Sequence, residues 1–110
     1  MAIIYTRTRQ DKCVDEGTGN VTSFIIGITA KDDADSNDNT NSAYMDGIKS
    51  ITPKLEANLT KTDVDIAETN FRAETNDDGE NIDTQLANRI ANRQAGYLRV
   101  EDSDYSNLPA

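Results

Sequence analysis

The chain has 110 residues, with 20 acidic and 11 basic side chains, a formal net charge of −9, one cysteine and no histidine. This length predicts one small domain. The large apolar side chains are so sparse that a thin core is expected, and neither a disulfide framework nor a zinc site is available to reinforce it. The acidic balance disfavours nucleic acid as a partner, and no apolar stretch is long enough to cross a membrane.

We expect synthesis in the cytosol. The apolar run Met1 to Tyr5 is too short for a signal peptide, and the lone Cys13 suits a reducing compartment. A thin core then favours burial against partner subunits as the source of the missing stability.

Two strands are predicted in the first third of the chain. Residues 3–9 begin apolar and then alternate threonine with arginine, as in a strand with one solvated face. After a glycine-rich turn at Gly17 to Asn20, residues 21–30 are β-branched and aromatic. Strict alternation places Phe24, Ile26, Ile28 and Ala30 on one face, and Val21, Ser23, Ile25, Gly27 and Thr29 on the other.

The next segment, Lys31 to Ser42, is rich in Asp and Asn and predicts a loop. Tyr44 to Ile51 follows as a return strand, which makes the acidic loop the tip of a long hairpin. Gly47 is interpreted as a bulge, and Pro53 as the end of the strand.

Two helices complete the predicted domain. Thr60 and Asp63 form a capping box for the first, which places Val64, Ala67 and Phe71 on one face and stops near the turn at residues 76–79. In the second, Ile82, Leu86 and Ile90 make an apolar stripe. Asn81 caps its start, Gly96 its end, and Arg89 and Arg93 lie near its negative end. The small Ala87 and Ala91 beside the stripe fit either close packing on a sheet or contact with a partner subunit.

We therefore predict an α+β fold, with an antiparallel sheet built on the hairpin 21–51 and two helices against one face. Residues 1–100 form the domain, and Tyr97 to Val100 are expected to add a short edge strand. Glu101 to Ala110 then form an extended C-terminal arm that requires a partner to hold it.

The acidic loop offers one candidate metal site. Asp33, Asp35 and Asn37 carry oxygen ligands at alternate positions, as in the first half of a calcium-binding loop. The match breaks at Asp38, where the motif requires glycine, and at Tyr44, where it requires glutamate. A solvated hairpin tip is the favoured interpretation, so no cofactor is expected, and Ca²⁺ is kept as the alternative.

No catalytic residue is predicted. A nucleophile needs an activating base, and this chain has no histidine to serve as one. Cys13, between Lys12 and Val14, has only charged neighbours to tune its thiol. The basic Arg7, Arg9 and Lys12 contrast with the acidic loops and raise the alternative of head-to-tail association, although an ordinary surface strand explains them better.

One family resemblance combines several of these features. They are the strand end Ile28-Thr29-Ala30-Lys31-Asp32, the Asp- and Asn-rich loop, the return Ser42-Ala43-Tyr44-Met45-Asp46-Gly47, the Leu59-Thr60 helix start, the final helix Leu86 to Ile90, and Leu108-Pro109. Together they resemble small virion structural proteins of tailed phages that infect marine bacteria, such as cyanophages. The resemblance implies a structural role in the particle and no catalytic residues.

The expected function is accordingly that of a non-enzymatic capsid decoration or cement subunit, localised in the virion and bound to the major capsid protein. A tail, neck or fibre-adaptor subunit of the same particle, in contact with neck or tail proteins, is one alternative, and self-association is a further candidate contact. A calcium-binding interaction module is the alternative from another class. Acidic mimicry of nucleic acid by a small inhibitor is less favoured, because the charges are confined to loops.

Overall fold

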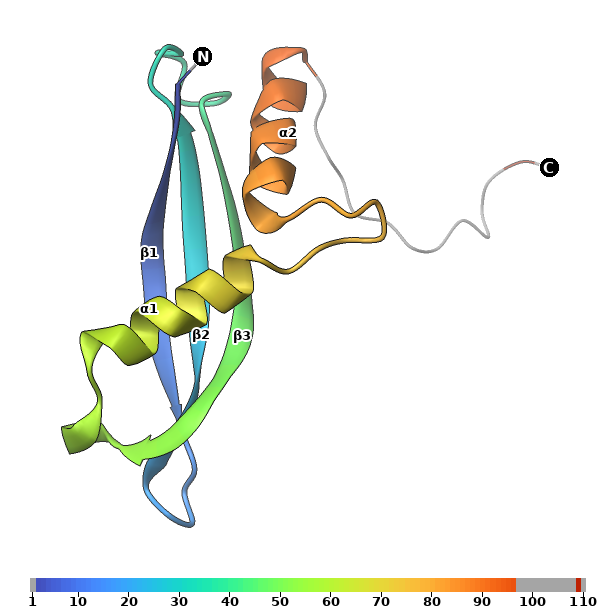
Figure 1. The fold of residues 1–110 in the computed structure, drawn as a ribbon. Coiled ribbons are helices and arrows are strands. Elements are labelled where there is room, and N and C mark those ends of the chain that lie inside the picture. Colours follow the sequence, from blue (N-terminus) through green and yellow to red (C-terminus); the bar gives the residue numbers. More distant parts are fainter. Residues whose placement is uncertain (1, 97–108, 110) are drawn as a thin grey trace.

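A computed structural model describes residues 2–96 and residue 109. Three long strands, β1 (Ile3–Val14), β2 (Asn20–Asp32) and β3 (Ser42–Leu55), form an antiparallel sheet in the order β1-β2-β3. A 3₁₀ turn, η1 (Glu56–Asn58), leads to the helices α1 (Lys61–Arg72) and α2 (Ile82–Gln94). Both helices pack on the same face of the sheet, α1 across the strands and α2 alongside β3 (Figure 1). The predicted α+β fold is confirmed.

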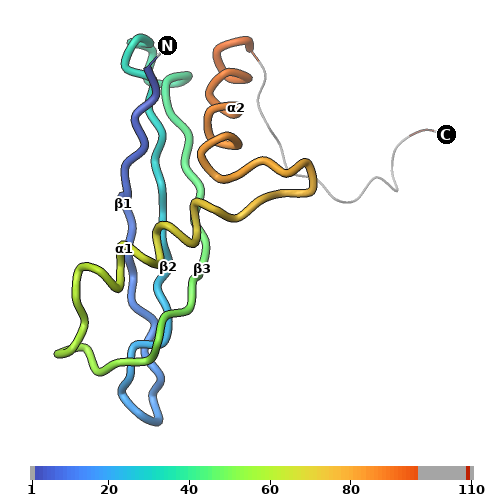
Figure 2. The backbone as a smooth tube through the Cα atoms, in the orientation of Figure 1, coloured from blue at the N-terminus to red at the C-terminus, as the bar shows by residue number. Residues whose placement is uncertain are grey.

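The path of the chain is a simple meander followed by two helical segments, and the backbone trace shows no crossover between strands (Figure 2). Each strand is longer than predicted. The strand β1 ends at Val14 rather than at Arg9, and β2 ends at Asp32 rather than at residue 30. The strand β3 runs from Ser42 to Leu55 rather than from Tyr44 to Ile51.

The helix-covered face of β2 supplies the centre of the core, as its alternation predicts. Ile26, Ile28 and Ala30 are fully buried there. Val21 is a correction, because it too is fully buried in the core, although strict alternation assigns it to the opposite face. The pairing of β2 with β1 skips Thr22 between Ser23 and Val21, and this extra residue reverses the direction of the side chains that precede it.

The strand β3 corrects two further predictions. It continues through Pro53 to Leu55, which an edge strand tolerates because one side of its backbone needs no partner. Gly47 is not a bulge, since it pairs in register with Ile26. The missing side chain instead makes room for Phe71 of α1: a Cβ atom at Gly47 would lie 2.7 Å from Cε1 of that ring.

Both helices begin as predicted. Asp63 accepts a hydrogen bond from the backbone N–H of Thr60 at 2.9 Å, and Asn81 accepts one from the N–H of Thr84 at 2.9 Å. The first helix ends at Arg72, four residues before the predicted turn. The apolar stripe of α2 is buried, whereas Ala91 beside it is exposed. The core therefore consists of the following residues: Val21, Phe24, Ile26, Ile28, Ala30, Ala43, Ala67, Phe71, Ile82, Leu86 and Ile90.

The predicted edge strand at Tyr97 to Val100 lies outside the described residues, as does nearly all of the arm from Glu101. Gly96, the last described residue before them, has a φ of 91°, in the left-handed region that the predicted helix stop requires.

Candidate functional site

The acidic loop between β2 and β3 is held by bonds within itself. Asp35 accepts hydrogen bonds from the N–H of Asn37 at 2.9 Å and from the hydroxyl of Thr40 at 2.6 Å. These two bonds, together with a contribution from Gln94, lower the pKa of the Asp35 carboxyl group. The carboxylate oxygens of Asp35 therefore stabilise the turn.

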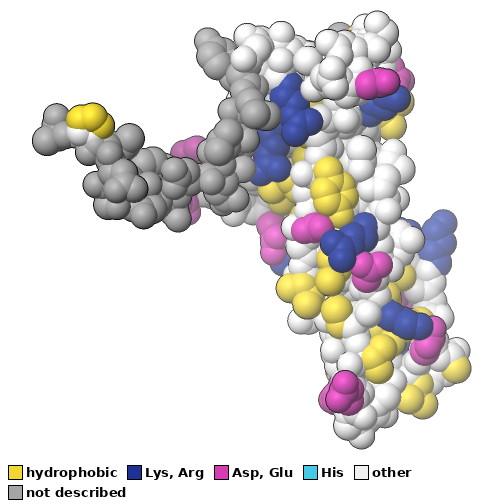
Figure 3. Space-filling model, turned by 180° about the vertical axis from the view of Figure 1, so that it is seen from behind, with side chains coloured by type: hydrophobic (Ala, Val, Ile, Leu, Met, Phe, Trp, Pro, Cys, Tyr) yellow, Lys and Arg dark blue, Asp and Glu magenta, His cyan; other side chains and the backbone are white. Residues whose placement is uncertain are grey.

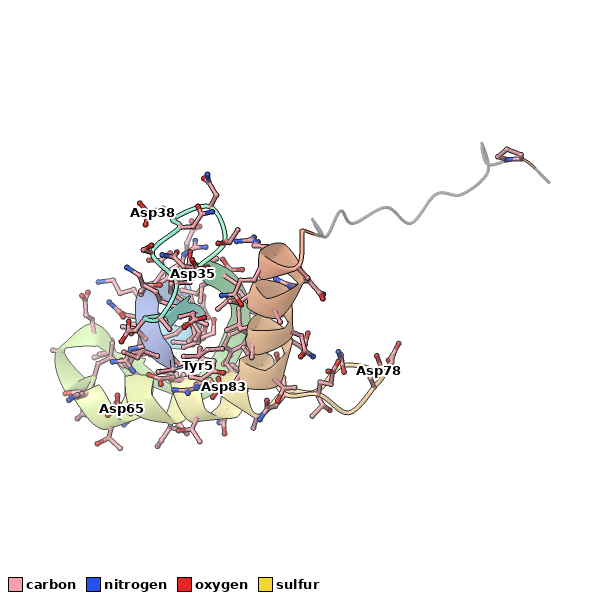
Figure 4. All side chains as sticks on the ribbon, turned by 90° about the horizontal axis from the view of Figure 1, so that it is seen from above. Tyr5, Asp35, Asp38, Asp65, Asp78 and Asp83 are labelled. Carbon is pink, nitrogen blue, oxygen red and sulfur yellow. The ribbon has the colours of Figure 1, made fainter. Side chains whose placement is uncertain are left out.

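The amide groups of the loop are used in the same way. Asn37 accepts a hydrogen bond from the N–H of Asn39 at 3.0 Å, and Asn41 donates to the carbonyl oxygen of Asp35 at 3.2 Å. Figure 4 shows Asp38 at the outer tip of this loop and Asp35 nearer the body of the domain. Such bonds are typical of Asx turns, which fix a loop without a ligand.

The three predicted calcium ligands stand as follows. Asp33 is exposed, Asp35 is half-buried with both carboxylate oxygens bonded, and Asn37 is exposed with its side-chain oxygen bonded. Among residues 2–96, no three Asp, Glu, Cys or His side chains are grouped so that they could hold a metal ion. Calcium binding by this loop stays an untested alternative, which a calcium titration of the protein can decide.

Sequence reasoning missed the connection between this loop and α2. Asp32, at the end of β2, is only 3% exposed. Its carboxylate accepts hydrogen bonds from the side chain of Gln94 at 2.8 Å and from the N–H of Ala34 at 3.0 Å. Gln94 also donates to Asp35 at 3.1 Å. The last turn of α2 thus fixes the base of the acidic loop, and an Asp at a strand end is too common to signal this.

A second missed cluster joins the two helices to β1. Arg72 donates to both carboxylate oxygens of Asp83, at 2.9 Å and 2.6 Å, and to Glu68 at 3.0 Å. Its guanidinium group lies 5.6 Å from the ring centre of Tyr5, and Figure 4 shows Tyr5 near Asp83, between the sheet and α1. Burial, and secondarily the charge of Asp83, raise the pKa of Tyr5, which Arg72 partly opposes. The bonded carboxylates in turn raise the pKa of Arg72. The cluster fixes α1 against α2.

The basic residues of β1 have acidic partners within the molecule. Arg7 bonds Asp65 and Glu68 of α1, each at 2.9 Å, and Lys12 forms an ion pair with Glu56. The positive charge that suggested head-to-tail association is therefore used within the fold.

The opposite face of the sheet carries a short polar ladder. Arg9 donates to Asp11 at 2.6 Å and to Asp46 at 2.9 Å, and the hydroxyl of Tyr44 donates to Asp46 at 3.0 Å. Burial and the bond to Asp46 raise the pKa of Tyr44. The Tyr44 ring lies over Gly27, where a Cβ atom would collide with its Cε2 atom. Gly27 is thus required by this ladder.

Comparison of the chain with protein-family models, with curated proteins and with solved structures finds no match. Neither described helix is long and apolar enough to span a membrane.

Proposed function

We propose that this chain is a non-enzymatic structural subunit of a phage virion, a decoration or cement subunit that binds the major capsid shell. The resemblance in sequence supports the phage particle as the setting. The observation that supports docking is the contrast between the two edges of the sheet.

The first residues of the edge strand β3 are covered by α2. Arg93 donates to the carbonyl oxygen of Ser42, and Arg89 donates to that of Tyr44 at 3.4 Å. These carbonyl groups face away from β2, and two positive side chains cover them. Charged groups on an edge strand discourage pairing with a further strand.

The other edge is β1, which pairs with β2 alone among the described residues, and a bulge at Thr8 interrupts its twelve residues. The N–H of Asp33 donates to the carbonyl oxygen of Ala2 at 3.0 Å, so the backbone groups of Ala2 point toward β2. Because backbone groups alternate along an antiparallel strand, those of Ile3, Tyr5 and Arg7 point outward. The part of β1 before the bulge, from Ile3 to Arg7, is therefore a template on which a strand of the shell can pair, with main-chain hydrogen bonds supplying affinity.

The proposal is tested by adding the purified chain to empty shells assembled from the major capsid protein of the encoding phage. Ile3→Pro removes one outward N–H at the start of the edge strand, a position where proline leaves the ladder to β2 intact. The loss of one backbone hydrogen bond is expected to weaken binding about two- to tenfold. Hydrogen exchange of β1 amides should slow on binding.

Ser42→Pro is the matched control. It also replaces the first residue of an edge strand, and its N–H points away from β2 because the neighbouring Asn41 accepts from the N–H of Asp32. Shell binding should be unchanged in this variant. Failure of the wild-type chain to cosediment with shells, or equal loss in both proline variants, would contradict docking through β1.

A further inference from the structure

The face of the sheet opposite the helices carries no covering element among the described residues. Across the three strands its side chains form five rows, read from the pairing register. In order of β1, β2 and β3 these rows are Ile4-Lys31-Ser42, Thr6-Thr29-Tyr44, Arg9-Gly27-Asp46, Asp11-Ile25-Ile48 and Cys13-Ser23-Ser50. We call this surface the open face. Figure 3 shows it from behind, with hydrophobic side chains interleaved with charged ones.

The open face exposes large apolar side chains that a monomer gains nothing by displaying. Ile48 is 62% exposed, Ile4 51% and Tyr44 42%, and they are spread along the sheet rather than gathered at one end. These side chains offer apolar contacts to a partner at three of the five rows.

The charge of the open face differs from that of the rest of the molecule. It carries two positive side chains, Arg9 and Lys31, and two negative ones, Asp11 and Asp46, so its formal charge is 2 − 2 = 0. The whole chain has a formal charge of −9, all of which therefore lies elsewhere. Like charges facing each other across an interface oppose association, so the open face is where two equally acidic copies can meet.

Three of the four charges on the open face already have partners. Arg9 is bonded to both Asp11 and Asp46, so packing a second surface against it buries paired groups. Lys31 is exposed in the row at one end of the face and has no bonded partner among the described residues, and its long side chain can keep the ammonium group in solvent at the rim of an interface. Thr8 and Thr29 likewise bond each other through their hydroxyl groups at 2.7 Å.

The area is that of a weak interface. Five rows about 6.8 Å apart cover about 34 Å along the strands, and three strands cover a width of about 14 Å. The open face therefore has a projected area of about 480 Å², and two copies would bury about 950 Å² in total, which is typical of weak or transient complexes.

We propose that a second copy of this chain binds the open face, so that two sheets pack face to face into a sandwich about 10 Å thick with the helices outside. The inference goes beyond the proposed function and does not rest on it, because the edge of β1 serves shell binding whether the chain is a monomer or a dimer.

Sedimentation equilibrium of the full chain at about 1 μM to 1 mM tests the proposal. The expected result is a dimer that dissociates in the micromolar range, as an interface of this size and mixed polarity predicts. Ile48→Asp, at the most exposed apolar position of the open face, should raise the dissociation constant at least about tenfold.

Ile66→Asp is the matched control, because Ile66 is 52% exposed on α1, away from the open face. Its dimer should match the wild type within about twofold. Ile4→Asp is a second open-face variant, and it decides the matter if circular dichroism shows that Ile48→Asp does not fold. A chain that stays monomeric at 1 mM, or a dimer that tolerates both open-face variants, or one disrupted by Ile66→Asp alone, would overturn the proposal. Shell binding by the monomeric variant would show that only the self-association is affected.

Discussion

A single methyl group at Gly47 tests the packing of α1 on the sheet. In Gly47→Ala the new Cβ would lie 2.7 Å from Cε1 and 3.1 Å from Cδ1 of Phe71. Carbon atoms in contact prefer about 3.5–4.0 Å, so the ring or the strand must move by nearly 1 Å. Phe71 is 2% exposed and belongs to the core cluster, so a shift of its ring disturbs other core side chains.

The expected loss can be worked out from two opposing effects. Overpacking a core of this density costs about 1–3 kcal/mol. Replacing glycine restricts the unfolded chain and returns about 0.4–1 kcal/mol. Gly47→Ala should therefore lower the free energy of unfolding by about 1–2 kcal/mol, measured by urea denaturation followed by circular dichroism.

A double-mutant cycle identifies the cause of this loss. Phe71→Leu removes the ring edge that the methyl group meets and by itself costs about 1–2 kcal/mol. If the clash is responsible, the double variant should be more stable than the sum of the two changes by at least about 1 kcal/mol. Gly17→Ala is the control, since it adds the same methyl group in an exposed turn where the nearest atom is 3.3 Å away. A Gly47→Ala variant as stable as the wild type, or strict additivity in the cycle, would refute the packing account.

Three further predictions concern the caps and the acidic loop. Asn81→Ala should lower the free energy of unfolding by about 1 kcal/mol, because it removes the acceptor for the N–H of Thr84; no loss in urea denaturation would contradict the cap. The bond from Lys54 and that from the N–H of Thr60 lower the pKa of Asp63. The stability that these two bonds give the folded protein is fully present when the pH is above the unfolded-state pKa of about 3.9. It is lost as the pH falls through the lower folded-state pKa. Wild-type protein should therefore exceed Asp63→Asn in thermal stability at pH 6, and the gap should narrow toward pH 3; a constant gap would count against this bond. Because the side-chain oxygens of Asp35 and Asn37 are already bonded, 5 mM CaCl₂ should leave the melting temperature unchanged within about 1 °C, whereas a rise of several degrees would establish the calcium module.

The sequence patterns predicted those parts of the fold that depend on neighbours along the chain. Asn81 and Thr60 were identifiable as caps, because their partners lie within three residues. The buried stripe of α2 could be predicted in the same way, because its apolar residues recur every four positions along the chain.

What the patterns missed depends on contacts between distant segments. The glycine at position 47 suggested a bulge because the ring it accommodates belongs to a helix 24 residues away in sequence. Val21 was assigned to the wrong face because a single extra residue in β2 reverses the alternation. Nothing in the local sequence identifies Thr22 as that extra residue.

The candidate surfaces were harder to predict than the elements. The Asp and Asn residues of the loop suggested metal ligands, and only the partners of Asp35 show how its oxygens are used. The zero formal charge of the open face can be recognised only when the register of the three strands is known, because its charged residues come from positions 9 to 46 of the chain.

The composition of the virion tests the central claim most directly. If a phage encodes this chain as we propose, its particles, banded in a density gradient and analysed by quantitative mass spectrometry, should contain the chain at a fixed ratio to the major capsid protein, and the chain should remain bound through a second gradient. Its absence from banded particles, with the protein present only in the soluble fraction of infected cells, would contradict a structural role in the virion.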